Sequence, residues 1–207
     1  MTKKLFSAVL LAAGRSTRMG RDKALLASAG GRDSVPLWQR QRNVLARAGA
    51  AEIFLSAREE QGWVASAVTD GNFAAVVRDA TPGCGPLGGI VAALERASHP
   101  HLAVLAIDLP RLEPDWFASL RAECAPGIGC VGRRAGGRII SGGGNFFEPL
   151  AAIYPRELLP LASAAFGRGE FSLQRLLTTA VAQGLMRVRV IGADEAAWFE
   201  NWNEPPE

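Results

Sequence analysis

The residues from Leu11 to Lys23 combine small side chains with dense positive charge, a combination suited to binding a polyanion. They read L-A-A-G-R-S-T-R-M-G-R-D-K, with two glycines, three arginines and a closing lysine. Small residues let a ligand approach the backbone closely, and N–H groups in such a turn donate hydrogen bonds to phosphate oxygens. This stretch therefore predicts a phosphate-binding loop. From its residues alone, a solvated basic loop is the alternative.

Two aspartates could supply the acidic groups of a phosphate-transfer site. Asp79 opens a Gly-rich turn, and Asp108 directly follows the continuous apolar run 102–107. A carboxylate at the carboxyl end of a central strand lies where open α/β sheets bind ligands. Mg²⁺ takes few protein carboxylates and otherwise keeps waters and substrate phosphates. The combination predicts metal-assisted phosphoryl or nucleotidyl transfer. The structural alternative for Asp108 is a helix N-cap or a turn aspartate.

Other phosphate and hydrolase motifs fit the sequence less well. The P-loop pattern G-x-x-x-x-G-K-[ST] is absent, since five residues separate Gly14 from Gly20. The stretch 83–88 matches G-x-G-x-x-G, but four residues stand between it and the preceding strand, whereas the dinucleotide fingerprint turns directly out of its strand. With only two histidines, close together, a Ser-His-Asp hydrolase is also disfavoured.

The composition excludes several broad classes of protein. The 207 residues carry a formal net charge of +3, and their basic residues form no polybasic patch, which predicts neither a nucleic-acid nor a membrane partner. The apolar run near the N-terminus stops at Ala13, so it is interpreted as a strand and not as a signal peptide. The three cysteines are odd in number and lack C-x-x-C spacing, which favours reduced thiols and a cytoplasmic location.

The pattern of apolar residues predicts the elements that must position these groups. Strands alternate with helices as far as residue 125, which predicts an α/β fold with a mostly parallel sheet and helices on both faces. The rest is predicted to be a smaller mixed part on the same sheet, within one domain, 1–207. The expected strands are 5–11, 52–56, 73–77, 102–107, 128–132, 147–154 and 187–191; the expected helices are 36–48, 59–68, 86–97, 115–124, 155–166 and 171–182. Carboxyl ends of parallel strands share one edge, so the opening loop, Asp79 and Asp108 should converge.

These same residues resemble a known signature. The opening stretch is similar to L-A-(G/A)-G-x-S-x-R-M-G-x-D-K of the molybdenum cofactor guanylyltransferases and their nucleotidyltransferase relatives. The likeness continues through G-P-L-G-G at 85–89, D-L-P at 108–110, E-P-L at 148–150 and F-x-N-x-N-x-P at 199–205. It thus extends over nearly the whole chain.

The resemblance implies a Rossmann-like, three-layer α/β/α nucleotidyltransferase. It also implies GTP and molybdopterin as substrates, transfer of GMP to the phosphate of molybdopterin, release of pyrophosphate, Mg²⁺ as cofactor, and transient contact with cofactor-synthesis or acceptor proteins. Residues 1–125 would form the nucleotide-binding half and 126–207 the acceptor-substrate half. By position, the catalytic residues would be Lys23, Arg18 and Asp108, with Asp108 as the metal ligand. The nucleotide would contact Leu11, Ala12, Ala13, Gly14, Lys23, Ser56, Asp79 and Gly85, and Asn201 and Asn203 would lie near the pterin.

Two alternatives stay open at this point. The family more often has glycine where Ala13 stands and asparagine where Ser56 stands, and Glu204 replaces a threonine of the closing motif. A cytidylyltransferase acting on molybdopterin or another phosphorylated acceptor is therefore the alternative enzyme. The alternative outside the enzymes is a non-catalytic nucleotide-binding regulator, which a strand-end carboxylate together with Lys23 disfavours.

Overall fold

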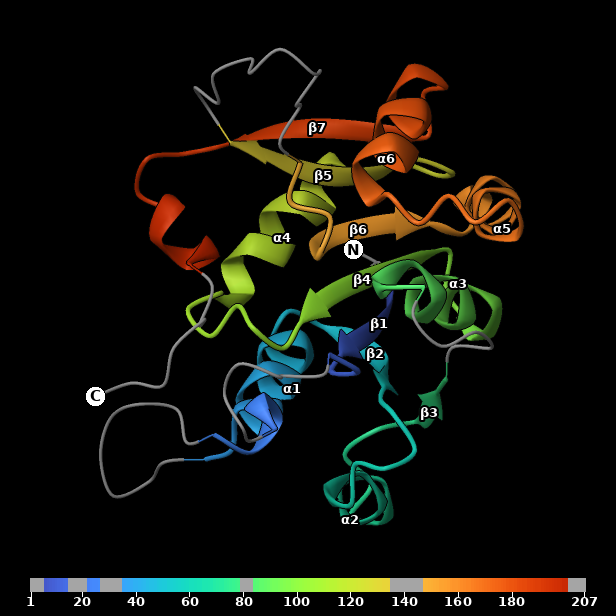
Figure 1. Ribbon diagram of the computed structural model, residues 1–207. Coiled ribbons are helices and arrows are strands. Elements are labelled where there is room, and N and C mark those ends of the chain that lie inside the picture. Colours follow the sequence, from blue (N-terminus) through green and yellow to red (C-terminus); the bar gives the residue numbers. More distant parts are fainter. Residues whose placement is uncertain (1–5, 15–21, 27–34, 79–83, 135–146, 201–207) are drawn as a thin grey trace.

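The computed structural model describes residues 6–14, 22–26, 35–78, 84–134 and 147–200 (Figure 1). Within them, seven strands form one sheet in the order β3-β2-β1-β4-β6-β5-β7. Their bounds are β1 Phe6–Leu11, β2 Ala50–Ser56, β3 Ala75–Val77, β4 His101–Ala106, β5 Gly129–Arg134, β6 Ala151–Pro155 and β7 Met186–Ile191. Strands β3, β2, β1 and β4 are mutually parallel, β6 is antiparallel to β4 and to β5, and β7 is parallel to β5. The α/β class and its mixed C-terminal part are confirmed.

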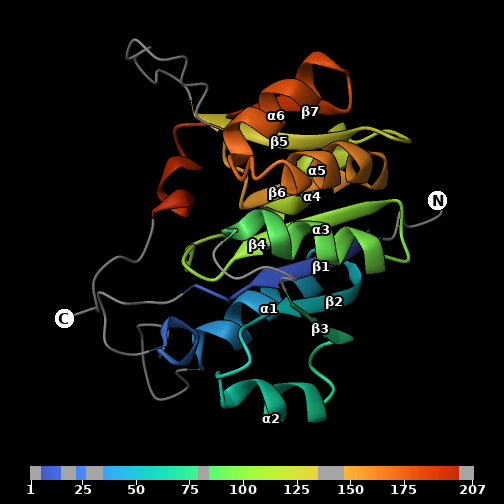
Figure 2. The same cartoon turned by 45° about the vertical axis from the view of Figure 1, so that its right-hand side comes forward.

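Helices cover both faces of this sheet. The α-helices are α1 Leu37–Arg47, α2 Trp63–Thr69, α3 Pro86–Arg96, α4 Pro114–Glu123, α5 Leu159–Gly167 and α6 Leu173–Ala182, and the 3₁₀ turns are η1 Lys23–Leu25, η2 Arg156–Leu158 and η3 Ala196–Phe199. Figures 1 and 2 show α3, α5 and α6 together on one side of the sheet. Buried residues of α1, α2 and α4 form a separate cluster on the other side. The three-layer prediction is therefore confirmed.

The central strands are apolar along their whole length because both of their faces are covered. Every residue of β1 is buried. Its apolar side chains alternate between the two faces of the sheet: Ala8 belongs to the buried cluster that includes α1 and α4, and Val9 belongs to the cluster that includes α3. Strand β4 is buried from Leu102 onward in the same way. Such continuous apolar runs are typical of parallel strands with helices on both faces.

Several predicted boundaries were wrong: β3 begins at Ala75 and not at 73, and α5 and α6 begin at Leu159 and Leu173 and not at 155 and 171. Polar contacts explain two further differences. The helix expected from Glu59 begins at Trp63, because the Gln61 side chain accepts a hydrogen bond from the Arg58 N–H and holds the preceding residues in a turn. The strand expected from Phe147 begins at Ala151, after a turn in which the Ala151 N–H donates to the Glu148 carbonyl.

Two further predictions concern membrane-spanning segments and disulfide bonds. No helix in the described part of the chain has the length and apolar character needed to cross a bilayer. All three cysteines, Cys84, Cys124 and Cys130, lie buried, and none forms a disulfide within the described residues.

Candidate active site

The carboxyl ends of β1, β2 and β4 lie side by side, which brings the predicted groups to one edge. Leu11 at the end of β1 pairs with Ser56 of β2 and with Ala106 of β4. Just beyond the strands, the Ala12 N–H donates to the Ser56 carbonyl at 2.8 Å, and the Ile107 N–H donates to the Leu11 carbonyl at 3.0 Å. The opening loop and the turn that carries Asp108 therefore leave the sheet as direct neighbours, as predicted.

Asp108 is half-buried and lies in a turn that α1 holds from behind. The Gln41 amide donates to the Leu109 carbonyl at 2.6 Å, and the Arg40 Nε donates to the Pro110 carbonyl at 2.6 Å. Helix α4 takes Glu113 as its N-cap residue, so Asp108 does not cap it. The helix N-cap is therefore wrong for Asp108, whereas its place in a turn agrees with the other structural alternative. Its carboxylate makes no hydrogen bond or ion pair with another residue that the structure describes.

Asp108 offers one carboxylate at this edge of the sheet. Clusters of three or more His, Cys, Asp or Glu side chains suited to a metal are absent from the described ranges. A cation held by Asp108 would take its other ligands from water, from substrate oxygens or from residues outside those ranges. Mg²⁺ prefers that arrangement, since it keeps several waters and takes one or two carboxylates plus phosphates.

Lys23 stands at the far end of the opening stretch, in the short turn η1. Asp22 caps this turn, because its Oδ1 accepts a hydrogen bond from the Ala24 N–H at 3.1 Å. The turn is tied to α1 through the Leu37 N–H, which donates to the Leu26 carbonyl at 2.8 Å. Lys23 is thereby fixed at its backbone near the edge of the sheet.

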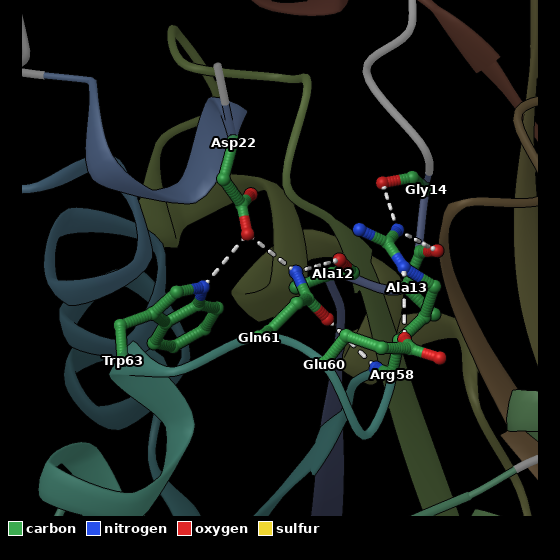
Figure 3. A network of polar contacts seen from close by, with 8 residues as sticks. All are labelled: Ala12, Ala13, Gly14, Asp22, Arg58, Glu60, Gln61 and Trp63. Carbon is green, nitrogen blue, oxygen red and sulfur yellow. Dashed lines mark hydrogen bonds and ion pairs between the residues drawn. The ribbon is translucent and has the colours of Figure 1, made fainter.

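Three side chains that follow β2 contact the opening stretch, and the sequence did not single them out as functional. Arg58 Nη1 donates to the carbonyls of Ala13 at 2.6 Å and Gly14 at 2.5 Å. The remaining bonds converge on Ala12 and Asp22 (Figure 3). Gln61 Nε2 donates to the Ala12 carbonyl at 3.1 Å and to Asp22 Oδ2 at 2.7 Å, and Trp63 Nε1 donates to Asp22 Oδ2 at 2.8 Å. A weak signal was available: an Arg, a Gln and a Trp follow within seven residues of the end of β2, on the edge where the loop was expected.

Ser56 is buried, as are Leu11 and Ala12 among the other predicted nucleotide contacts. Its side chain is 2% exposed and lies against α3. A Cβ placed on Gly89 would come within 2.6 Å of Ser56 Oγ and 3.0 Å of Leu11 Cδ2. The helix reaches this position through Gly85, whose φ of 65° places it in the left-handed region that favours glycine. The G-P-L-G-G stretch thus lets α3 pack closely against the ends of β1 and β2.

The C-terminal part of the chain brings a charged pair to the same edge. Because β6 is antiparallel to its neighbours, its start lies on the edge where β4 and β5 end. There Arg134 forms an ion pair with Glu148, and its Nη2 donates to the Phe199 carbonyl at 3.2 Å. Four of the predicted site residues, Arg18, Asp79, Asn201 and Asn203, lie outside the described residues.

Comparisons with known proteins agree with this arrangement. Residues 8–184 match the MobA-like NTP transferase domain family. A probable molybdenum cofactor guanylyltransferase of Opitutus terrae is 42% identical, over 95% of this chain and 89% of that protein. Another, from Deinococcus radiodurans, is 32% identical over 96% of this chain and 90% of its own length.

A solved structure supports the fold. The molybdopterin-guanine dinucleotide biosynthesis protein A of Archaeoglobus fulgidus superposes with a TM-score of 0.68 at 19% identity, covering 96% of this chain and 93% of that one. The resemblance read from the opening signature is confirmed, and the protein is a nucleotidyltransferase. The chain belongs to the MobA-like NTP transferase family, among the molybdenum cofactor guanylyltransferases.

Proposed function

We propose that this chain transfers GMP from GTP to the phosphate of molybdopterin and releases pyrophosphate. The observation that carries the proposal is the adjacency of the signature loop and Asp108, joined by the hydrogen bond from the Ile107 N–H to the Leu11 carbonyl at 3.0 Å. Cationic and N–H groups for the phosphates thereby stand beside a carboxylate. The names of the relatives supply the identity of the two substrates.

In the proposed reaction, an oxygen of the molybdopterin phosphate attacks the α-phosphorus of GTP. The new P–O bond forms as the bond to the β-phosphate breaks, and the electron pair leaves with pyrophosphate. Lys23 and the N–H groups of the loop hold the charge that develops on the phosphate oxygens. Arg18 and Asp79 belong to the same proposal as a triphosphate contact and a nucleotide contact. Positioning and electrostatics carry such a transfer without a covalent protein intermediate.

Asp108 is the residue that we propose to hold Mg²⁺. When bound there, the ion would neutralise phosphate charge and act as a Lewis acid on the phosphoryl oxygens. The fixed turn behind Asp108 supports this role. Gln41 and Arg40 hold the carbonyls of the next two residues, so the carboxylate is presented from a rigid position.

The acceptor would bind on the side of β5 and β6, in the half from 126 to 207. Arg134 and Glu148 lie at the ends of these strands, on the same edge as Asp108. Arg134 also contacts Phe199, two residues before Asn201. This supports a pterin site toward Asn201 and Asn203, on the opposite side of Asp108 from the β2 strand.

The test is a direct assay with the purified protein, molybdopterin and Mg²⁺. We expect pyrophosphate release and a guanine dinucleotide product with GTP, and a larger rise in melting temperature with GTP than with CTP, because a ligand that binds the folded state stabilises it. A preference for CTP in both measurements would favour the cytidylyltransferase. Nucleotide binding without any transfer would favour the regulator.

A further inference from the structure

The carbonyl groups of Ala12, Ala13 and Gly14 are all held by side chains from the segment after β2. Gln61 binds the first, and a single guanidinium nitrogen of Arg58 binds the other two. Consecutive carbonyls of an extended strand alternate in direction. Here three in a row meet neighbouring donors, so the chain has already left the strand geometry of β1 at this point.

The held carbonyls determine where the N–H groups of the loop point. In a trans peptide the C=O and the following N–H point in opposite directions. The N–H groups of Ala13 and Gly14 are therefore directed away from Gln61 and Arg58. Successive N–H groups on one side of the backbone form a concavity that binds anions. The hydrogen bonds of Arg58 and Gln61 thus fix the direction of these two N–H groups.

The other described end of the signature is held by the same segment. Asp22 Oδ1 accepts from the Ala24 N–H, while Oδ2 accepts from Gln61 Nε2 and from Trp63 Nε1. Three donors on one carboxylate leave it fixed and make Asp22 a poor metal ligand compared with Asp108. The Trp63 ring is itself stacked on Trp38, with ring centroids 5.7 Å apart and planes at 16°.

Gln61 links the two described ends of the signature, and hydrogen bonds fix the orientation of its own amide group. Its side chain is 5% exposed, its Oε1 accepts from the Arg58 N–H at 2.7 Å, and both of its amide donors are used. A buried amide in which each group has a partner holds one orientation. Residues 12–14 and 22–24, which flank the middle of the signature, are therefore fixed relative to each other through one side chain.

We propose that Arg58, Gln61 and Trp63 are positioning residues for the nucleotide triphosphate. They act through the backbone of residues 12–14 and through Asp22, which sets the place of Lys23. This inference rests on the proposed function, because it assumes that the signature loop holds the phosphates. It predicts that breaking the network weakens recognition of the β- and γ-phosphates more than recognition of the nucleoside.

The decisive measurement is the ratio of the dissociation constants for GMP and GTP, taken by calorimetry on the full chain. Trp63→Phe removes the indole N–H that donates to Asp22, together with part of the ring, and changes no charge. Trp116→Phe makes the same change of ring elsewhere, so a loss specific to Trp63→Phe is assigned to the bond with Asp22. We expect Trp63→Phe to lower the Kd for GMP divided by the Kd for GTP about threefold, because the affinity for GTP falls more than the affinity for GMP. Arg58→Ala should lower this ratio about tenfold, as expected for lost hydrogen bonds that involve a charged group. The kcat for transfer should fall about 10- to 100-fold in Arg58→Ala, the scale of misplaced reacting groups.

Two matched variants control for general destabilisation. Trp116→Phe removes an indole N–H that donates to the Ala151 carbonyl at 2.8 Å, inside the core. Arg187→Ala removes a guanidinium that donates to the Glu123 carbonyl at 2.7 Å, near the start of β7 at the other edge of the sheet. Both should leave the GMP to GTP ratio unchanged, even where the melting temperature falls.

An unchanged ratio in Trp63→Phe and Arg58→Ala would overturn the inference, and so would an equal loss of affinity for GMP and GTP. Failure of the proposed function gives a different result: the wild-type chain then transfers no GMP. In that case the same ratio, measured with the monophosphate and triphosphate of the nucleotide that it does bind, still decides whether the network acts on the phosphates.

Discussion

Gly89 offers a quantitative test of how closely α3 packs against the nucleotide edge. An added Cβ would lie 2.6 Å from Ser56 Oγ, 3.0 Å from Leu11 Cδ2 and 3.2 Å from Ser56 Cβ. All three atoms belong to residues at the ends of β1 and β2 that are themselves buried. Gly89→Ala therefore inserts a methyl group where no space exists, and Ser56 or the helix must move.

The expected effect is the difference between two opposing contributions. Overpacking a core costs about 1–3 kcal/mol. Replacing a helical glycine with alanine returns about 1 kcal/mol through helix propensity. We expect Gly89→Ala to lower the free energy of unfolding by up to about 2 kcal/mol on balance, or the melting temperature by up to about 8 °C for a chain of this size.

A second substitution and a control make the test specific. Ser56→Ala removes the atom at 2.6 Å but leaves the contacts at 3.0 and 3.2 Å, so the double variant should recover part of the loss. Gly167→Ala, at the end of α5, meets nothing within 4 Å and should be neutral or more stable by about 0.5 kcal/mol. Chemical denaturation of the four variants gives these values. A Gly89→Ala protein more stable than the wild type, or a double variant with no recovery, would refute the packing described at this edge.

Three further predictions concern the carboxylate, acid stability and a buried thiol. Asp108→Asn should lower transfer at least about 10²-fold and weaken the Mg²⁺ dependence, while the melting temperature stays near that of the wild type, since the carboxylate serves the reaction and not a helix cap. Burial by itself raises the pKa of Glu52, but hydrogen bonds from Ser7 and Ser98 outweigh it and hold that pKa below 4.5. The stabilisation is therefore present above 4.5 and is lost as the pH falls through the lowered pKa, so Glu52→Gln should show a weaker decline in unfolding free energy below pH 4.5 than the wild type. Burial raises the pKa of Cys130 to about 11, so this thiol should resist a disulfide reagent in the folded protein and react on unfolding; rapid labelling of the native chain would contradict it.

The sequence predicted best those parts of the fold whose local residue pattern indicates a single type of secondary structure. The apolar runs of β1 and β4 suit only strands with both faces covered, and Asp108 stands at the end of the second run. The opening signature likewise combines charge and small residues in one stretch. Its place beside Asp108 then follows from the parallel order of the strands, because parallel neighbours end at the same edge.

The network after β2 was missed because its acceptors are backbone carbonyls far away in the chain. Arg58 and Gln61 lie in a polar stretch that is typical of a solvated turn, and nothing in their sequence marks Ala12 or Ala13 as partners, 49 and 45 residues earlier. The start of α2 was misplaced for a local reason, because the Gln61 side chain accepts a hydrogen bond from the Arg58 N–H. A side chain committed to such a bond ends or delays a helix, and propensity does not register it.

The network of Arg58, Gln61 and Trp63 is confined to one part of the chain. Every partner in it lies between Ala12 and Trp63, in the unit formed by β1, α1, β2 and the start of α2. Asp108 follows β4, and the ion pair of Arg134 and Glu148 belongs to β5 and the turn before β6. The bonds that hold residues 12–14 therefore use no residue from the strands after β2, so substitutions in those later strands can change the rest of the edge without removing any of these bonds.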